Sequence, residues 1–181
     1  VIAGYFGGWI DQFVNYILTC QLALHGLLLA MTLVFLIGPS IPVVIIVIGC
    51  LHWTLFLVVT RSVTKRIAKL DFVSASNAIG ATKLQIIIQD ILPGIINQII
   101  VIFTLEVGVA ILAEASLSFL GVGIQPPTPS WGLLIAEGKE AIFFQPWLIV
   151  LPGIALFLLV VSINMLGDGL RDIMDPKSKL E

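Results

Sequence analysis

Residues Asp71 to Gly94 read DFVSASNAIGATKLQIIIQDILPG and mix charged, small polar and apolar side chains at helical spacing. Most of the remaining chain consists of continuous hydrophobic runs. Phe72, Ala75 and Ile79 follow one another at intervals of three and four residues, which places them on one face of a short helix. An amphipathic helix of this kind can lie on a membrane surface between two spans.

Both ends of this short helix carry boundary signals. Asp71 is a typical N-cap residue, so we expect it to cap the first turn. Gly80 tolerates the left-handed conformation that ends many helices, which predicts a C-terminal stop there. A second helical run is predicted from about Thr82 to Leu92 and Pro93. The local prediction is therefore a helix, a glycine turn and a second helix.

The composition of the whole chain indicates a membrane protein. Its residues are 59% hydrophobic and 11% charged, and the mean hydropathy is +1.11. A membrane span needs roughly 20 mostly apolar residues. We therefore predict an all-α membrane protein, a polytopic helical bundle whose single domain covers residues 1–181. Its four complete spans are expected at about residues 17–37, 41–59, 95–113 and 147–166.

The distribution of basic residues predicts how the chain is oriented. Five of them lie between the second and third spans, namely Arg61, Lys65, Arg66, Lys69 and Lys83, and three follow the fourth span, namely Arg171, Lys177 and Lys179. Only Lys139 lies in the other long connection, at about residues 121–146. The positive-inside rule then places the loop at about residues 60–90 and the C-terminus in the cytoplasm, with the 121–146 loop outside. A net charge of −2 gives no indication of a nucleic-acid partner.

The Asp71 to Gly94 stretch resembles the cytoplasmic coupling loop of binding-protein-dependent ABC importer permeases. In that family the loop docks into a groove on the ATP-hydrolysing subunit. Five positions match the family pattern: Ala75, Gly80, Ala81, Leu92 and Pro93. Ser74 stands where the family usually has Glu, and Ser76 where it usually has Ala. The resemblance implies coupling to the ATPase through Asp71, Phe72, Ala75, Ile79, Gly80 and Ala81.

Three further segments extend the resemblance over essentially all of the chain. GYFGGWID at residues 4–11, an interfacial turn by composition, resembles the turn after an early span in the dipeptide, oligopeptide and nickel group of these permeases. On that basis we expect the chain to be an N-terminally truncated fragment. The segments ILAEASLSFLGVGIQPPTPSWG at 111–132 and GDGLRDIMDPKSK at 167–179 resemble family signatures, the first forming an external, partly re-entrant loop. The structural positions implied are Pro93, Glu114, Gly121, Trp131, Gly167, Asp168 and Arg171.

Polar side chains inside the apolar segments are candidates for function, because burying them is costly. Gln21 and Glu106 could line a translocation pathway, and Glu106 could instead form a structural hydrogen bond to a sister subunit. The spacings of Cys20 to His25 and of Cys50 to His52 put neither pair on one helical face. We therefore predict packing and interhelical hydrogen bonds for these four residues, and no metal site.

The sequence lacks the motifs of a catalyst. No G-x-x-x-x-G-K-[ST], H-E-x-x-H or G-x-S-x-G motif is present, so a non-enzymatic subunit without its own cofactor is predicted. The resemblance implies the permease subunit of an ATP-driven importer of peptides or a related small solute, such as nickel or a metal chelate. Its implied partners are ATPase subunits that use ATP and Mg, a second related permease, an external substrate-binding protein and the lipid bilayer of a prokaryotic plasma (inner) membrane. The alternative is a non-transporting scaffold that recruits a cytoplasmic partner through the amphipathic loop.

Overall fold

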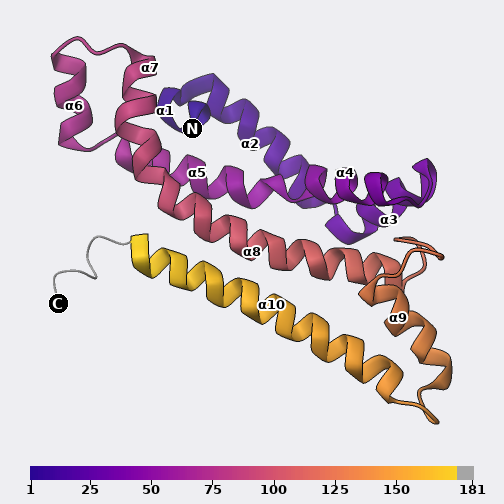
Figure 1. The fold of residues 1–181 in the computed structure, drawn as a ribbon. Coiled ribbons are helices and arrows are strands. Elements are labelled where there is room, and N and C mark those ends of the chain that lie inside the picture. Colours follow the sequence, from indigo (N-terminus) through magenta and orange to yellow (C-terminus); the bar gives the residue numbers. More distant parts are fainter. Residues whose placement is uncertain (175–181) are drawn as a thin grey trace. The chain divides into compact units, whose positions relative to one another are not determined.

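The structure, a computed structural model, describes residues 1–174. These residues form helices and turns without a strand, which confirms the all-α prediction (Figure 1). In chain order the elements are α1 (Ile2–Phe6), α2 (Gly8–Ala23), α3 (Gly26–Ile37), α4 (Ile41–Leu51), α5 (Trp53–Ile67), α6 (Asp71–Ala78), α7 (Lys83–Gln85), the π-helix η1 (Ile86–Ile91), α8 (Leu92–Phe119), α9 (Trp131–Gly138), the 3₁₀-helix η2 (Lys139–Ala141) and α10 (Trp147–Met174).

Several helices of the described chain are long and apolar enough to cross a membrane. Three qualify directly, at Ile41–Ile67, Lys83–Phe119 and Trp147–Ile173. A fourth follows if the broken pair Gly8–Ala23 and Gly26–Ile37 counts as one span. The break lies at Leu24 and His25, inside the stretch predicted as the first span, and His25 is the N-cap of α3.

The opening residues 4–11 were predicted as an interfacial turn, and the structure confines the turn to Gly7 and Gly8. They form the end of α1 and the start of α2, with a short break at Gly7. Gly7 and Gly8 have positive φ values of 63° and 56°. The glycines therefore turn the backbone between two helices, and the residues on either side remain helical.

The long helix after α6 and its glycine turn begins at Lys83 and does not end at Pro93. Residues Ile86–Ile91 form a π-helical segment, in which the Leu92 N–H reaches the carbonyl of Ile87. Helix α8 begins at the next residue, Leu92, and Pro93 is its second residue. A proline ring normally collides with the carbonyl four residues earlier. The carbonyl four residues before Pro93 belongs to Gln89, which lies inside the wider π-helical segment. Local π-helical turns of this kind are found where a helix accommodates proline.

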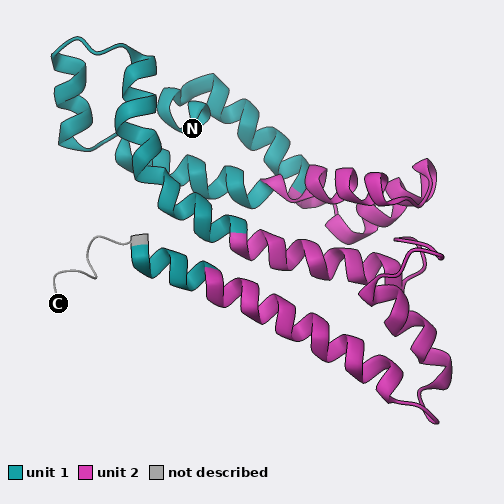
Figure 2. Ribbon diagram, viewed as in Figure 1, with its two compact units in different colours: residues 1–21, 54–103, 167–181 teal, residues 22–53, 104–166 magenta. Residues whose placement is uncertain are grey.

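The chain divides into two compact units, shown in Figure 2. Unit 1 comprises residues 1–21, 54–103 and 167–181, and unit 2 comprises residues 22–53 and 104–166. The core of unit 1 is formed by the buried residues Val63, Ile67, Val73, Ile86, Ile91 and Ile95. The core of unit 2 is formed by Ala30, Val34, Val44, Val47, Ile48 and Leu117.

Candidate functional site

The short helix α6 in unit 1 is held by one buried residue and exposes most of its apolar surface. Val73 is 1% exposed and packs in the core of unit 1. Phe72 is 49% exposed, Ile79 is 88% exposed, and Ala75 is also exposed. An apolar helical surface of this kind fits the groove-binding mode in which anchors at helical spacing enter a partner.

The N-terminal boundary of α6 differs from the prediction by one residue. Leu70 is the N-cap, with extended backbone angles of φ −77° and ψ 151°, and Asp71 is already helical. The Asp71 carboxylate therefore lies in the first turn, where a negative charge interacts favourably with the helix dipole. The prediction that Asp71 is the N-cap is wrong, because the residue before it makes the change from extended to helical backbone.

The C-terminal boundary of α6 confirms the predicted stop at Gly80. Gly80 has a φ of +91°, and its N–H donates to the carbonyl of Asn77 at 3.1 Å. The Ala81 N–H donates to the carbonyl of Ser76, also at 3.1 Å. These two bonds form a Schellman motif, which depends on a left-handed residue at this position.

The second helix starts at Lys83, next to the predicted start near Thr82, and Thr82 is its N-cap. The Thr82 N–H donates to Gln85 Oε1 at 2.9 Å, and Thr82 Oγ1 accepts from the Gln85 N–H at 3.4 Å. This capping box satisfies donors that the helix itself leaves free. Because the Schellman motif ends α6 and the capping box starts α7, only residues 79–82 connect two fixed helix ends.

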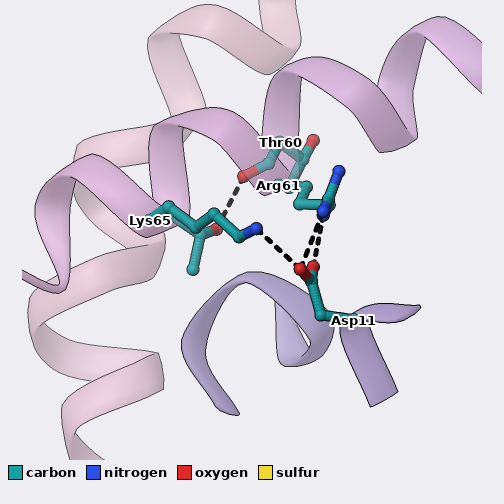
Figure 3. Close-up of polar contacts among 5 residues, drawn as sticks. Asp11, Thr60, Arg61 and Lys65 are labelled. Atoms are coloured by element: carbon teal, nitrogen blue, oxygen red, sulfur yellow. Dashed lines mark hydrogen bonds and ion pairs between the residues drawn. The ribbon is translucent and has the colours of Figure 1, made fainter. Parts of the chain in front are cut away.

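An ion cluster in unit 1 was missed by the sequence analysis. Asp11 of α2 accepts hydrogen bonds from Arg61 and Lys65 of α5 (Figure 3). Arg61 binds both carboxylate oxygens through Nε and Nη2, the latter at 2.7 Å, and Lys65 Nζ lies 2.7 Å from Asp11 Oδ2. The side chains of Asp11 and Arg61 are only 15% and 18% exposed.

Two features of the sequence are consistent with this cluster. Arg61 and Lys65 are four residues apart, so they share a helix face. Asp11 begins a long apolar segment, where an unpaired carboxylate would be costly. Neither feature identifies the other partner, because 50 residues separate Asp11 from Arg61. The short segment at residues 4–11 was read as a turn, which hid Asp11 as a pairing candidate.

The predicted signature positions of unit 2 lie around the connection from α8 to α9. Ser118 Oγ donates to Glu114 Oε1 at 2.6 Å and accepts from the Ile124 N–H at 2.9 Å. Ser118 is fully buried, so this pair of bonds fixes the chain just after the helix ends. Gly121, with a φ of +80°, makes the turn between them.

The loop predicted at 121–146 contains helix α9, which the sequence analysis did not anticipate. Trp131 is its first residue, and Ser130 Oγ caps it by accepting from the Leu133 N–H at 3.2 Å. Gly132 is buried against α8, where an added Cβ would lie 2.0 Å from the carbonyl oxygen of Ala115. This close backbone contact seats α9 and leaves no room for a side chain.

The C-terminal signature positions lie within α10. Gly167 is buried and Asp168 is exposed, and the helix continues past both to Met174. Arg171 lines a cavity of about 390 Å³ in unit 1. The other lining residues are Val59, Gly94, Asn97, Gln98, Val101 and Ile102. The predictions for Lys177 and Lys179 fall outside the described residues.

The predicted pathway residues belong to different units, Gln21 to unit 1 and Glu106 to unit 2. Glu106 on α8 is half-buried, and among the described residues its Oε2 atom has no hydrogen-bond partner. Asn164 Oδ1 on α10 is buried and unpartnered in the same sense, and it would lie 3.3 Å from a Cβ added at Gly108. Gln21 is half-buried near the end of α2 and makes a polar interaction. Unit 2 therefore offers two unsatisfied oxygens along α8 and α10.

The histidines and cysteines take separate positions. His52 ends α4, and its Nδ1 lies 2.9 Å from the carbonyl of Ile48, whereas His25 precedes α3. Cys20 and Cys50 are exposed free thiols. Within residues 1–174, no group of three His, Cys, Asp or Glu side chains is arranged to hold a metal ion.

Comparison with known proteins gives consistent results. The family described as "Binding-protein-dependent transport system inner membrane component" matches residues 1–180. The glutathione transport system permease protein GsiD of Escherichia coli O6:K15:H31 (strain 536 / UPEC) is 40% identical over 175 residues, and the GsiD protein of Shigella dysenteriae serotype 1 is 39% identical over the same length. Each alignment covers 97% of this chain and 58% of the relative. The chain thus spans a little over half the length of these curated relatives.

Proposed function

This chain belongs to the family of binding-protein-dependent transport system inner membrane components, and from that premise we propose that it acts as the permease subunit of an ATP-driven ABC importer. The observation that carries the proposal is the geometry of α6. The side chains of Phe72 and of the C-cap residue Ile79 are exposed, while Val73 and the structured turn at Gly80 hold the helix in place. A helix that is fixed on one face and apolar on the other is suited to transmit a partner's movement.

In this proposal the chain hydrolyses no ATP and binds no cofactor itself. Separate ATPase subunits bind α6 in a groove, and their closure on ATP moves unit 1. Ser74 is exposed on α6, so the absence of a carboxylate there leaves the apolar contact through Phe72 and Ile79 intact. A second, related permease subunit and an external substrate-binding protein complete the importer in the inner membrane.

We further propose an orientation and a substrate class. The basic residues around α5 and α6 support a cytoplasmic position for α6 and for the C-terminus, with Lys139 outside. The relatives carry the name of a glutathione permease, and glutathione is a small peptide. Uptake of small peptides is therefore the substrate class that we favour over nickel or a metal chelate. The unpartnered oxygens of Glu106 and Asn164 support a polar surface completed by solute, water or the second permease.

The test is ATP hydrolysis by the assembled complex. The full-length protein, purified with its co-expressed ATPases and second permease and placed in liposomes, should hydrolyse ATP several-fold faster when peptide-loaded binding protein is added. A scaffold that only recruits a cytoplasmic partner would show no such increase. Retention of the ATPases without any response to the loaded binding protein would therefore favour the scaffold function.

A further inference from the structure

The last turns of α5 make different contacts on two opposite faces. Arg61 and Lys65 bind Asp11 of α2 on one face. Val63 and Ile67 lie two residues further on, which is about 200° around the helix, and they pack in the core that buries Val73 of α6. The same part of α5 therefore forms ion pairs with α2 on one side and shares a hydrophobic core with α6 on the other.

Helix α1 adds a second connection to the same region. Gly4 is buried so closely against α5 that an added Cβ would lie 2.8 Å from the Arg61 carbonyl oxygen and 2.8 Å from Thr64 Cβ. Phe6 lies under the Lys83 ammonium, which is 5.3 Å from the ring centroid. Tyr5 packs against the core of unit 1. Helix α1 thus contacts α5, which precedes α6, and Lys83, which follows it.

Resting on the proposed coupling role of α6, we propose that Asp11 is a positioning residue of the coupling apparatus. It fixes the last turns of α5 against α2, so that α1, the start of α2 and α6 move together when the ATPases close. The two-pronged contact with the Arg61 guanidinium restricts both side chains to one geometry. Without the carboxylate, Arg61 and Lys65 would be like charges four residues apart, which repel each other on a helix. The end of α5 would then lose its fixed position on α2.

The first test is Asp11→Asn in the complete importer. We expect the complex to assemble with its ATPases, while the number of ATP molecules hydrolysed per solute imported rises about three- to tenfold. The matched control is Arg66→Gln, which removes an exposed cation from the same helix. Among the described residues Arg66 takes part in no ion pair, so its removal should leave that ratio within error of the wild type. A wild-type ratio in Asp11→Asn would overturn the proposal.

A charge swap separates positioning from general packing. Asp11→Arg and Arg61→Asp alone should each uncouple transport. The first variant brings three cations together, at positions 11, 61 and 65. The second removes the guanidinium that binds Asp11 and leaves two carboxylates side by side. The double variant restores an Arg–carboxylate pair beside Lys65 and should recover most of the wild-type ratio. Failure to recover, with all variants assembled, would refute the assigned role.

A milder variant covers the case in which Asp11→Asn does not assemble. Lys65→Gln removes one of the two cations that bind Asp11, so it should raise the number of ATP molecules hydrolysed per solute imported by a smaller amount. A value equal to that of Arg66→Gln would count against the proposal. If the wild-type complex itself shows no stimulated ATP hydrolysis, the proposed importer function fails instead. The two failures are thus distinguishable.

Discussion

Gly132→Ala should strongly destabilise the folded protein and lower its unfolding temperature. The added methyl group would lie 2.0 Å from the carbonyl oxygen of Ala115 and 2.7 Å from its carbonyl carbon, and both atoms belong to the backbone of α8. A backbone cannot move aside as a flexible side chain can, so we expect a loss of about 3 kcal/mol or more in the free energy of unfolding. The measurement is thermal unfolding of the full-length chain in detergent.

Gly153→Ala is the matched control for this prediction. Gly153 lies inside α10, and nothing approaches within 4 Å of a Cβ added there. Alanine is the better helix former by about 1 kcal/mol, so this variant should be as stable as the wild type or slightly more stable. Equal unfolding temperatures for Gly132→Ala and Gly153→Ala would show that α9 is not seated directly on α8.

Gly80→Val should abolish coupling while leaving the membrane helices intact. No atom lies within 4 Å of a Cβ added at Gly80, so the cost comes from the backbone, whose φ is +91°. A β-branched residue in this region is strained by about 1 to 3 kcal/mol, which corresponds to roughly one to two powers of ten in docking affinity. We expect a complex that retains its second permease and loses both stimulated ATP hydrolysis and uptake.

Two controls isolate the backbone effect at Gly80. Asparagine adopts left-handed conformations more readily than other residues, so Gly80→Asn should keep most of the activity. Gly26 also has open space around an added Cβ but no positive φ, so Gly26→Val tests the same bulk without the strain. Transport at the wild-type rate by Gly80→Val, with its ATPases firmly bound, would mean that α6 is not a coupling element.

The parts of this fold that sequence reasoning predicted depend on local signals. Gly80 ends α6 and Thr82 begins α7 because a left-handed glycine and a capping box each act within a few residues. The membrane helices follow from long apolar runs, and the resemblance to the peptide and nickel group of importer permeases is confirmed by the family match and by GsiD. The helix boundary at Leu70 was missed because it depends on the backbone angles of a single residue.

The parts that sequence reasoning missed depend on contacts between distant segments. Asp11 meets Arg61 only once α2 and α5 have packed, and nothing in the local pattern around either residue specifies that pairing. Helix α9 was hidden by the prolines before it, although Ser130 provides an N-cap. The π-helical segment at Ile86–Ile91 likewise arises from the way the helix accommodates Pro93, which periodicity does not reveal.

The position of Ile79 in the complete importer tests the central claim, that α6 binds the ATPase on the cytoplasmic side. Cys20 and Cys50 are first replaced by Ser, and a single cysteine is then placed at Ile79 or at Lys139, both of which are exposed. A short thiol cross-linker should join the cysteine at position 79 to an ATPase subunit. The cysteine at position 139 should form no such product and should react with an impermeant thiol reagent added outside intact cells. External labelling at position 79, or cross-linking of the ATPase only from position 139, would contradict the account.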